Sequence, residues 1–242
     1  MLKNILNKKS DYCLIFSDLF NLFIQGHQKK TIIIIDQLIK FLIKNNKTII
    51  LPTFNLNFPK TKITGFEDKY IQTGFLNKYV CMKYKFYRTK KPMYNYAVLG
   101  PKKNDILNLK QNTAWGKDSV LGHLVENNCT GIGLNIEKKF FNWLVIHYCE
   151  EKNKVPYRFY KTFKGRNINL KKNVYEKMYV RNLKKNFIED GLKINKQLLK
   201  KKTIKSFKIK HLSISLINLY DYSTEADKFL KKDIYSLVKN EK

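Results

Sequence analysis

The chain has 242 residues, which is enough to bury a sizeable core in one compact domain. Its formal net charge is +29, almost all from lysine, yet it contains no pattern typical of a helix-turn-helix, an RRM or a zinc site. Asn, Ile, Phe and Tyr are also frequent, so a bias in genome composition explains the lysine without a nucleic-acid partner. The apolar run at 31–35 is interrupted by Asp36 and Lys40, which excludes a membrane span.

The first half of the chain is predicted to alternate strands and helices, which favours a layered α/β fold. Strands are expected at 12–17, 48–52, 96–100 and 129–134, and helices at 32–44, 75–84 and 119–126. Ser119 or Asp118 can cap the last of these helices. Residues 55–73 are expected to form a long irregular loop, and loops of that length often belong to functional sites.

The second half begins with a predicted amphipathic helix at 138–151. After it we expect a strand at 157–163, short polar segments at 182–192 and 198–202, a strand at 208–219, and a closing helix at 223–238 capped by Ser223 or Thr224. No linker or repeat divides the chain. We therefore expect one domain over 1–242, with 157–242 folding back as its C-terminal part.

The start of the chain leads from Met1 into charged residues rather than into the apolar core of a signal peptide, so we expect a cytoplasmic protein. The four cysteines fit that expectation, because none belongs to a CxxC pair and all fall in apolar segments. They are predicted to be small core residues in a reducing compartment: Cys13, Cys81, Cys129 and Cys149.

His147 and Glu150 are three residues apart in the predicted helix 138–151, so their side chains share one face. A carboxylate in that position can accept a hydrogen bond from one imidazole nitrogen, which fixes the tautomer and leaves the other nitrogen free to act as a base. The same spacing also arises by chance on long helices. Cys149 is two residues from His147 and points to the opposite face, which argues against a Cys–His nucleophile.

Several segments occur in the order seen in one enzyme family. They are the strand that ends in Leu51-Pro52-Thr53-Phe54, the segment 74–80, Arg88-Thr89-Lys90-Lys91-Pro92, Trp115-Gly116-Lys117-Asp118-Ser119, and His147 to Arg158. This series resembles the aminoglycoside 3-N-acetyltransferase family over roughly residues 10–240. The resemblance implies a single layered α/β domain with a central mixed sheet.

The resemblance also implies acetyl transfer from acetyl-CoA to an amino group. His147 would be the general base and Glu150 its orienting partner. By analogy with the family, the cofactor would contact Ser17, Thr53 and the Arg88-Thr89 turn, with Ser119, Thr53 or Thr89 as a hydroxyl donor to the oxyanion. No metal is expected. Arg158 is expected to have a structural role or to lie at the edge of the site.

Two residues depart from the family pattern. Lys91 stands where the family has a histidine, and Leu144 where it has a threonine. The net charge of +29 also repels a polycationic aminoglycoside, so we expect an amino sugar that carries negative charge, such as a nucleotide-linked sugar. The acceptor is then a small molecule, no membrane is involved, and a homo-oligomer is compatible. The alternative is a non-catalytic relative that binds a nucleotide or nucleic acid through its lysine-rich surface.

Overall fold

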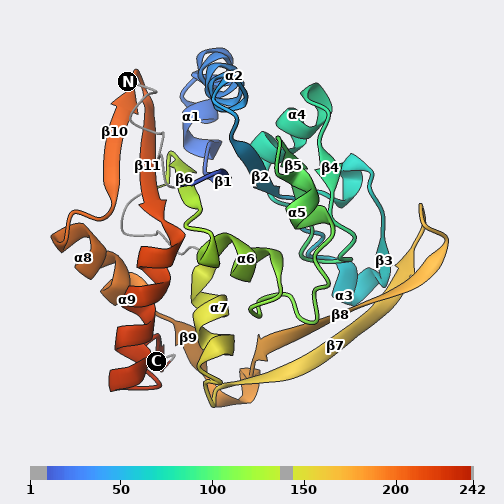
Figure 1. Cartoon of the computed structure of the whole chain (residues 1–242), viewed down its shortest axis with the longest axis vertical. Helices are drawn as coiled ribbons and strands as arrows, with labels where there is room; N and C mark the ends of the chain where they lie inside the picture. The colour runs from blue at the N-terminus through green and yellow to red at the C-terminus, as the bar shows by residue number, and fades with distance from the viewer. Residues whose placement is uncertain (1–9, 137–143, 241–242) are drawn as a thin grey trace.

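A seven-stranded mixed sheet forms the centre of the computed structural model, which describes residues 10–136 and 144–240 (Figure 1). The strand order is β10-β11-β6-β1-β2-β5-β4. Only the middle strands β6, β1 and β2 run parallel, and the others pair antiparallel. The strands are β1 (Tyr12–Ser17), β2 (Thr48–Pro52), β4 (Tyr87–Arg88), β5 (Tyr96–Leu99), β6 (Thr130–Leu134), β10 (Lys205–Ile209) and β11 (Leu212–Asn218).

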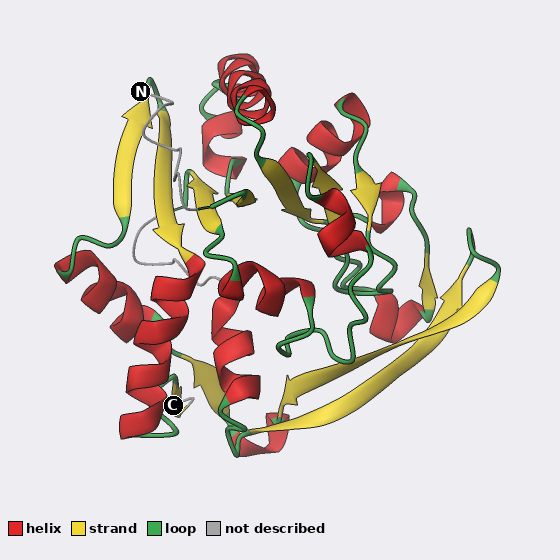
Figure 2. Ribbon diagram, viewed as in Figure 1, coloured by secondary structure: helices red, strands yellow, loops and turns green. Residues whose placement is uncertain are grey.

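Helices cover both faces of this sheet (Figures 1 and 2). The helices α1 (Phe20–Ile24), α2 (Gln28–Lys44) and α4 (Phe75–Lys83) pack on one face, and α5 (Lys103–Leu107), α6 (Val120–Glu126), α7 (Val145–Lys152) and α9 (Leu219–Lys232) pack on the other. The alternation of side chains along β1 supplies both layers, because Cys13 and Ile15 enter one buried cluster while Tyr12 and Leu14 enter the other. The expected layered α/β fold with a mixed sheet is confirmed.

The predicted strands of the first half and the helix 119–126 are found within one residue of their expected bounds. Ser119 is the cap of α6, since its Oγ accepts a hydrogen bond of 3.0 Å from the N–H of Gly122. Helix α2 begins at Gln28, four residues before the expected start. The interval 55–73 was wrongly expected to be irregular: it contains α3 (Phe58–Thr61), β3 (Ile63–Thr64) and the short 3-10 helix η2 (Asp68–Tyr70).

The second half departs further from the prediction. The expected strand 208–219 is a hairpin of β10 and β11, and Lys210 in its turn has a φ of +54°. Residues 192–200 form helix α8 (Leu192–Lys200) rather than a polar connection, and β9 (Phe187–Glu189) precedes it. Helix α9 begins four residues before the expected position, capped by Asn218, whose Oδ1 accepts from the N–H of Tyr220. Strand β12 (Val238–Asn240) follows and pairs with β9.

Helix α7 is described from Val145 onward, so the first residues of the predicted helix 138–151 lie outside the described part of the chain. One buried apolar cluster contains both Tyr12 and Val238, so the C-terminal elements share a core with the first strand. The division into one domain stays a prediction. In the described residues, no helix combines the length and the apolar character needed to cross a bilayer.

A long two-stranded ribbon extends from the body of the molecule and was only partly predicted. It consists of β7 (Arg158–Asn167) and β8 (Lys172–Arg181), which pair over their full length, with β3 added in parallel beside β7 (Figure 1). Gly165 lets this ribbon approach the α3–β3 turn, because a Cβ there would lie 2.2 Å from the carbonyl oxygen of Lys62. We call this pair of strands the β7–β8 ribbon.

Glu176 fastens the ribbon to the loop after β4. Its carboxylate, which is fully buried, accepts hydrogen bonds from the backbone N–H groups of Met93 (2.7 Å) and Tyr94 (3.2 Å). Burial raises the pKa of Glu176 from 4.5 to about 7, although the two N–H donors favour the charged form. The anchor is therefore a carboxyl group that loses its proton near neutral pH.

The stability of the protein should consequently depend on pH through Glu176. Because the folded pKa exceeds the unfolded value, this contribution is complete below pH 4.5 and is lost as the pH rises through about 7. The loss should approach about 3 kcal/mol. Urea unfolding at a series of pH values should show that the free energy of unfolding of Glu176→Gln rises relative to that of the wild type between pH 5 and 8. The exposed control Glu67→Gln should differ from the wild type by the same amount at every pH. The same constant difference for Glu176→Gln would contradict the prediction.

Candidate functional site

Helix α7 presents His147 and Glu150 on one face, as the spacing predicts. The imidazole Nδ1 of His147 lies 3.3 Å from Oε2 of Glu150. The His147 side chain is 19% exposed, whereas that of Glu150 is completely buried. Cys149 points the other way: its thiol is buried, and its Sγ lies 3.8 Å from the carbonyl oxygen of Ser223 in α9. Burial raises the pKa of the Cys149 thiol, so this side chain is not a nucleophile for the site.

Two further charged residues complete the cluster. Arg158, at the start of β7, lies with its Nε 2.8 Å from Oε2 of Glu150, and its Nη2 pairs with Oε1 of Glu189 from β9. The guanidinium Nη1 also donates to the carbonyl oxygen of Tyr179 at 3.2 Å. Arg158 is therefore at the centre of the site and not at its edge. We call His147, Glu150, Arg158 and Glu189 the charged cluster.

The contacts between His147 and the charged cluster are made by Nδ1. It faces Oε2 of Glu150 at 3.3 Å and Oε1 of Glu189 at 3.5 Å, with Nη2 of Arg158 at 3.1 Å. A proton on Nδ1 can be donated to either carboxylate, whereas the guanidinium, which has only N–H groups, bonds Nδ1 only when Nδ1 carries the lone pair. With its proton on Nδ1, the ring keeps the lone pair of Nε2 for chemistry.

Three of these groups, His147, Glu150 and Glu189, place one potential metal-ligand atom each within 4.8 Å of the others. The guanidinium of Arg158 already lies between the two carboxylates and is itself the cation of the cluster. A divalent ion would have to displace it. The arrangement therefore fits an oriented base better than a metal centre.

A series of aromatic rings in contact connects His147 to a second polar cluster. The ring centroids of His147 and Trp115 are 5.1 Å apart, those of Trp115 and Tyr94 are 4.3 Å apart, and those of Tyr94 and Phe54 are 4.7 Å apart. Phe54 directly follows Thr53 at the end of β2. The buried rings thus fix the position of His147 relative to the residues around Thr53.

Asn95 joins two of the residues that the resemblance implicates in cofactor binding. Its Oδ1 accepts from Oγ1 of Thr53 at 2.7 Å and from Nε of Arg88 at 2.9 Å. Arg88 also donates to the carbonyl oxygen of Thr53 at 3.1 Å. We call Thr53, Arg88 and Asn95 the Asn95 cluster. Thr89 follows Arg88 in the chain, but its hydroxyl accepts from the N–H of Tyr96 at 2.9 Å.

The other two residues of the predicted cofactor set lie apart from these. Ser119 is fully buried and its hydroxyl caps α6, so it is engaged by the backbone. Ser17 is half-buried at the carboxyl end of β1, next to α1. The structure thus brings together Thr53 and Arg88, whereas Thr89 bonds Tyr96 and Ser119 makes a capping bond.

Sequence reasoning missed Glu189, Asn95 and Trp115 as partners of the site. Glu189 lies in a short strand within the segment 182–192, whose polar composition gives no strand pattern. Asn95 belongs to no motif. Arg158 had a usable signal, because it is one of four arginines in a chain with 48 basic residues. A planar, permanently charged fork in a lysine-rich chain points to a buried pair with carboxylates.

Removing the guanidinium should expose how strongly the charged cluster is coupled. Arg158→Met leaves the buried Glu150 carboxylate without its cation, so it should lower the free energy of unfolding by about 3–5 kcal/mol. Arg158→Met combined with Glu150→Gln should recover a large part of that loss, as measured in a urea double-mutant cycle. Arg166→Met, on an exposed part of the same strand, is the matched control. Additive losses would show that Arg158 and Glu150 do not form one unit.

The chain was compared with protein families, curated proteins and solved structures. The profile of the aminoglycoside 3-N-acetyltransferase family matches residues 35–231. No curated protein matches the chain. The fold is similar to that of aminoglycoside acetyltransferase AAC(3)-IVa in its apoenzyme form, with a TM-score of 0.70 at 15% identity, covering 98% of this chain and 88% of that one.

Two further structures give the same result. The YokD protein from Bacillus subtilis has a TM-score of 0.70 at 17% identity, with 96% of this chain and 91% of that chain covered. AAC-IIIb in a binary complex with CoASH has a TM-score of 0.70 at 13% identity, with 92% and 90% covered. At such identities these structures establish the fold, whereas the family profile covers most of the sequence. The chain belongs to the aminoglycoside 3-N-acetyltransferase family, and it is a divergent N-acetyltransferase.

Proposed function

We propose that this protein transfers the acetyl group of acetyl-CoA to the amino group of an amino sugar, with His147 as the general base. The observation that carries the proposal is the held imidazole: Nδ1 of His147 faces two carboxylates, while the ring is partly exposed. The family supplies the reaction class. One solved relative with the same fold is a binary complex with CoASH, which supports the choice of acyl donor.

The chemistry requires no covalent enzyme intermediate. The acceptor nitrogen attacks the thioester carbonyl, a C–N bond forms, and the C–S bond breaks as the coenzyme A thiolate leaves. Nε2 of His147 takes the proton from the attacking amine and passes it to the departing sulfur, so charge and atoms balance. General-base help of this kind contributes about 10²–10⁴-fold.

Glu150, Glu189 and Arg158 act on this step through His147. The two carboxylates fix the ring orientation and accept from a proton on Nδ1, so that the lone pair of Nε2 points away from the charged cluster. Arg158 holds both carboxylates in place. All three are positioning residues and do not touch the acceptor. Neutral replacement of Glu150 should therefore weaken catalysis less than loss of the imidazole.

The Asn95 cluster is our candidate for holding the coenzyme A arm. Arg88 and Thr53 bring permanent donors to the carboxyl ends of the strands, where α/β proteins commonly bind ligands, and Ser17 ends the neighbouring strand β1. Ser119 would reach the cofactor only by giving up its cap. We therefore keep Thr53, Arg88, Thr89 and Ser17 as the cofactor-binding candidates, and Ser119 as the weakest of the set.

A small cavity at the foot of the β7–β8 ribbon suits an amino sugar. It has a volume of about 250 Å³, and its lining includes two carboxylates, Glu126 and Glu151, two lysines, Lys117 and Lys152, and the rings of Tyr148 and Tyr160. Glu151 is four residues after His147 in α7, so both side chains belong to one helix face. Burial raises the pKa of Glu151, whose Oε1 accepts from Thr113 at 2.6 Å. These carboxylates can receive the ammonium and hydroxyl groups of a sugar ring.

The remainder of the acceptor should carry negative charge. The chain has a net charge of +29, which repels a polycationic aminoglycoside and attracts a nucleotide-linked sugar. Lys91, in the position of a family histidine, has its Nζ bonded to the carbonyl oxygen of Gln111 at 2.7 Å. That departure is the observation that favours the second candidate function, a non-catalytic relative that binds nucleotides.

Coenzyme A should bind to the intact protein in the micromolar to millimolar range, and binding should weaken with added salt because its phosphates meet lysine and arginine. Calorimetry at two salt concentrations measures both. Arg88→Gln should weaken binding, because it removes the permanent charge from the Asn95 cluster. Lys205→Gln, an exposed lysine of β10, is the control. No heat at millimolar coenzyme A would support the non-catalytic alternative.

His147→Ala should lower kcat by about two to four decades while leaving coenzyme A affinity nearly unchanged, since the base acts on the amine. Glu150→Gln should cost less, and the double variant should be no worse than His147→Ala, because the two residues act as one unit. Thiol release in an acceptor screen measures turnover. Cys149→Ala should stay within a few-fold of the wild type. If the fold-losses in kcat of the two single variants instead multiply in the double variant, Glu150 does not orient His147.

A further inference from the structure

One face of the β7–β8 ribbon carries aromatic and basic side chains in alternation. Antiparallel pairing sets Tyr160 opposite Tyr179, and Lys164 opposite Tyr175, on the same face. Lys177 lies between these pairs, with its Nζ 4.5 Å from the centre of the Tyr160 ring. Arg166 extends the series toward the free end. We call this surface, from Tyr160 to Arg166 and from Asn173 to Tyr179, the outer face of the ribbon.

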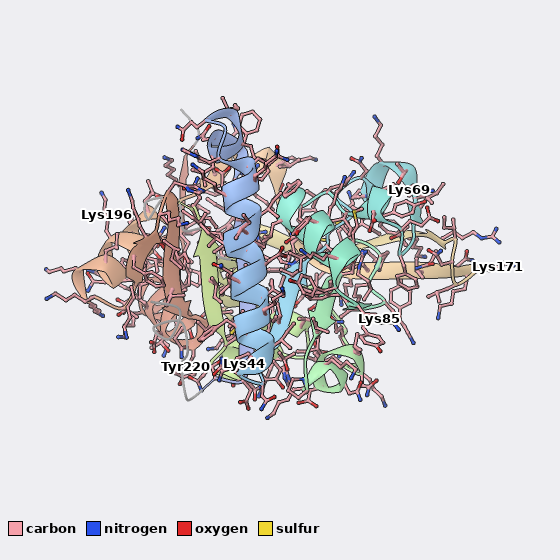
Figure 3. The ribbon with its side chains drawn as sticks, turned by 90° about the horizontal axis from the view of Figure 1, so that it is seen from above. Lys44, Lys69, Lys85, Lys171, Lys196 and Tyr220 are labelled. Atoms are coloured by element: carbon pink, nitrogen blue, oxygen red, sulfur yellow. The ribbon has the colours of Figure 1, made fainter. Side chains whose placement is uncertain are left out.

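The outer face is basic because its acidic residue is turned inward. Residues 158–181 contain eight lysines and arginines but one acidic residue, Glu176. That carboxylate is buried on the opposite face, against the backbone of Met93 and Tyr94. Figure 3 shows Lys171 at the free end of the ribbon, pointing away from the body. The ribbon therefore presents a positive surface that no carboxylate of its own strands offsets.

A cavity adjoins the outer face at its far end. It has a volume of about 470 Å³, and its lining includes Lys62, Lys164 and Arg166, the exposed ring of Tyr175, and no carboxylate. Tyr175 is 67% exposed, so its ring is available for stacking. Cations that converge beside an accessible aromatic ring are the features that bind the phosphates and the base of a nucleotide.

The outer face also leads directly to the charged cluster. Arg158 and Arg181 are the first pair of the same face, and the hydroxyl of Tyr160 lies 3.4 Å from Oε1 of Glu151 at the small cavity. Tyr175 is four residues along β8 from Tyr179, which is roughly 13 Å at the rise of a strand. A ligand that extends along the strands can therefore reach from the basic cavity to the foot of the ribbon.

We propose that the outer face of the β7–β8 ribbon binds the nucleoside diphosphate part of the acceptor, with the base on Tyr175 at the basic cavity and the phosphates on Lys164 and Lys177, on the side toward Tyr160. The amino sugar then lies in the cavity lined by Glu126 and Glu151, one turn of α7 from His147. This inference rests on the proposed function for its sugar end. Its nucleotide end rests on the ribbon alone and can be tested without turnover.

Coenzyme A also carries a nucleotide, but its candidate residues lie elsewhere. The Asn95 cluster and Ser17 stand at the carboxyl ends of the central strands, whereas the basic cavity is at the far end of the ribbon. Both ligands should therefore bind at once. A single nucleotide matches the size of the basic cavity, about 470 Å³, better than a long nucleic acid does.

The test is calorimetry of the full chain with uridine 5′-diphosphate, alone and with saturating coenzyme A. The double variant Lys164→Gln/Lys177→Gln and the single variant Tyr175→Ala should each weaken uridine diphosphate binding about tenfold or more, because the first removes charge-assisted bonds to the phosphates and the second removes stacking with the base. The matched control is Lys205→Gln/Lys208→Gln, which removes the same charge from β10. Coenzyme A affinity should be unchanged in both double variants, and so should the melting temperature.

Four results would overturn the inference. These are an absence of uridine diphosphate binding to the wild type, an equal loss in the β10 control, displacement of uridine diphosphate by coenzyme A, and tighter binding of a single-stranded oligonucleotide that the ribbon variants abolish. Failure of the proposed function looks different. In that case uridine diphosphate binds at the ribbon and responds to the variants, but no acetyl group is transferred to any nucleotide-linked amino sugar.

Discussion

The buried guanidinium of Arg158 is the contact on which the site depends. It pairs with Glu150 from α7 and with Glu189 from β9, and it belongs to the strand that begins the ribbon, so three elements meet at one side chain. Burying carboxylates is costly unless a cation and hydrogen bonds compensate for the lost solvation. Any rearrangement of α7, β7 or β9 would leave a charge unpaired. The packing of α7, β7 and β9 around Arg158 therefore sets the orientation of His147.

A division of labour between two kinds of basic residue follows from this. Most lysines lie at the surface, where ion pairs such as Lys69 with Glu67 are exposed to solvent and contribute little to stability. The few arginines at 88 and 158 instead hold interior networks, where a fixed planar donor is needed. The charge of the chain thus sets a long-range field, and its arginines set local geometry. A net charge count alone describes the first and not the second.

The sequence predicted those parts of the molecule in which local pattern and tertiary role agree. The strands β1 and β2 and the cap of α6 follow from apolar runs and from Ser119, and the pair of His147 and Glu150 follows from helical spacing. The hairpin at Lys210 could not be recognised, because its turn uses lysine at positive φ instead of Gly or Asn. Glu189 and Asn95 were missed because their roles arise from contacts between distant segments, which no local spacing encodes.

The ribbon imposes a rule on how this protein can vary. Arg158 reaches the charged cluster because its position in β7 has a fixed parity, shared with Tyr160 and Lys164 along one face. Insertion of a single residue near the start of β7 would send every later side chain of that strand to the other face, which would turn Lys164 inward and Phe163 outward. Residues added at the free end leave the position of Arg158 unchanged. The ribbon should therefore vary in length at its free end and stay constant where β7 begins.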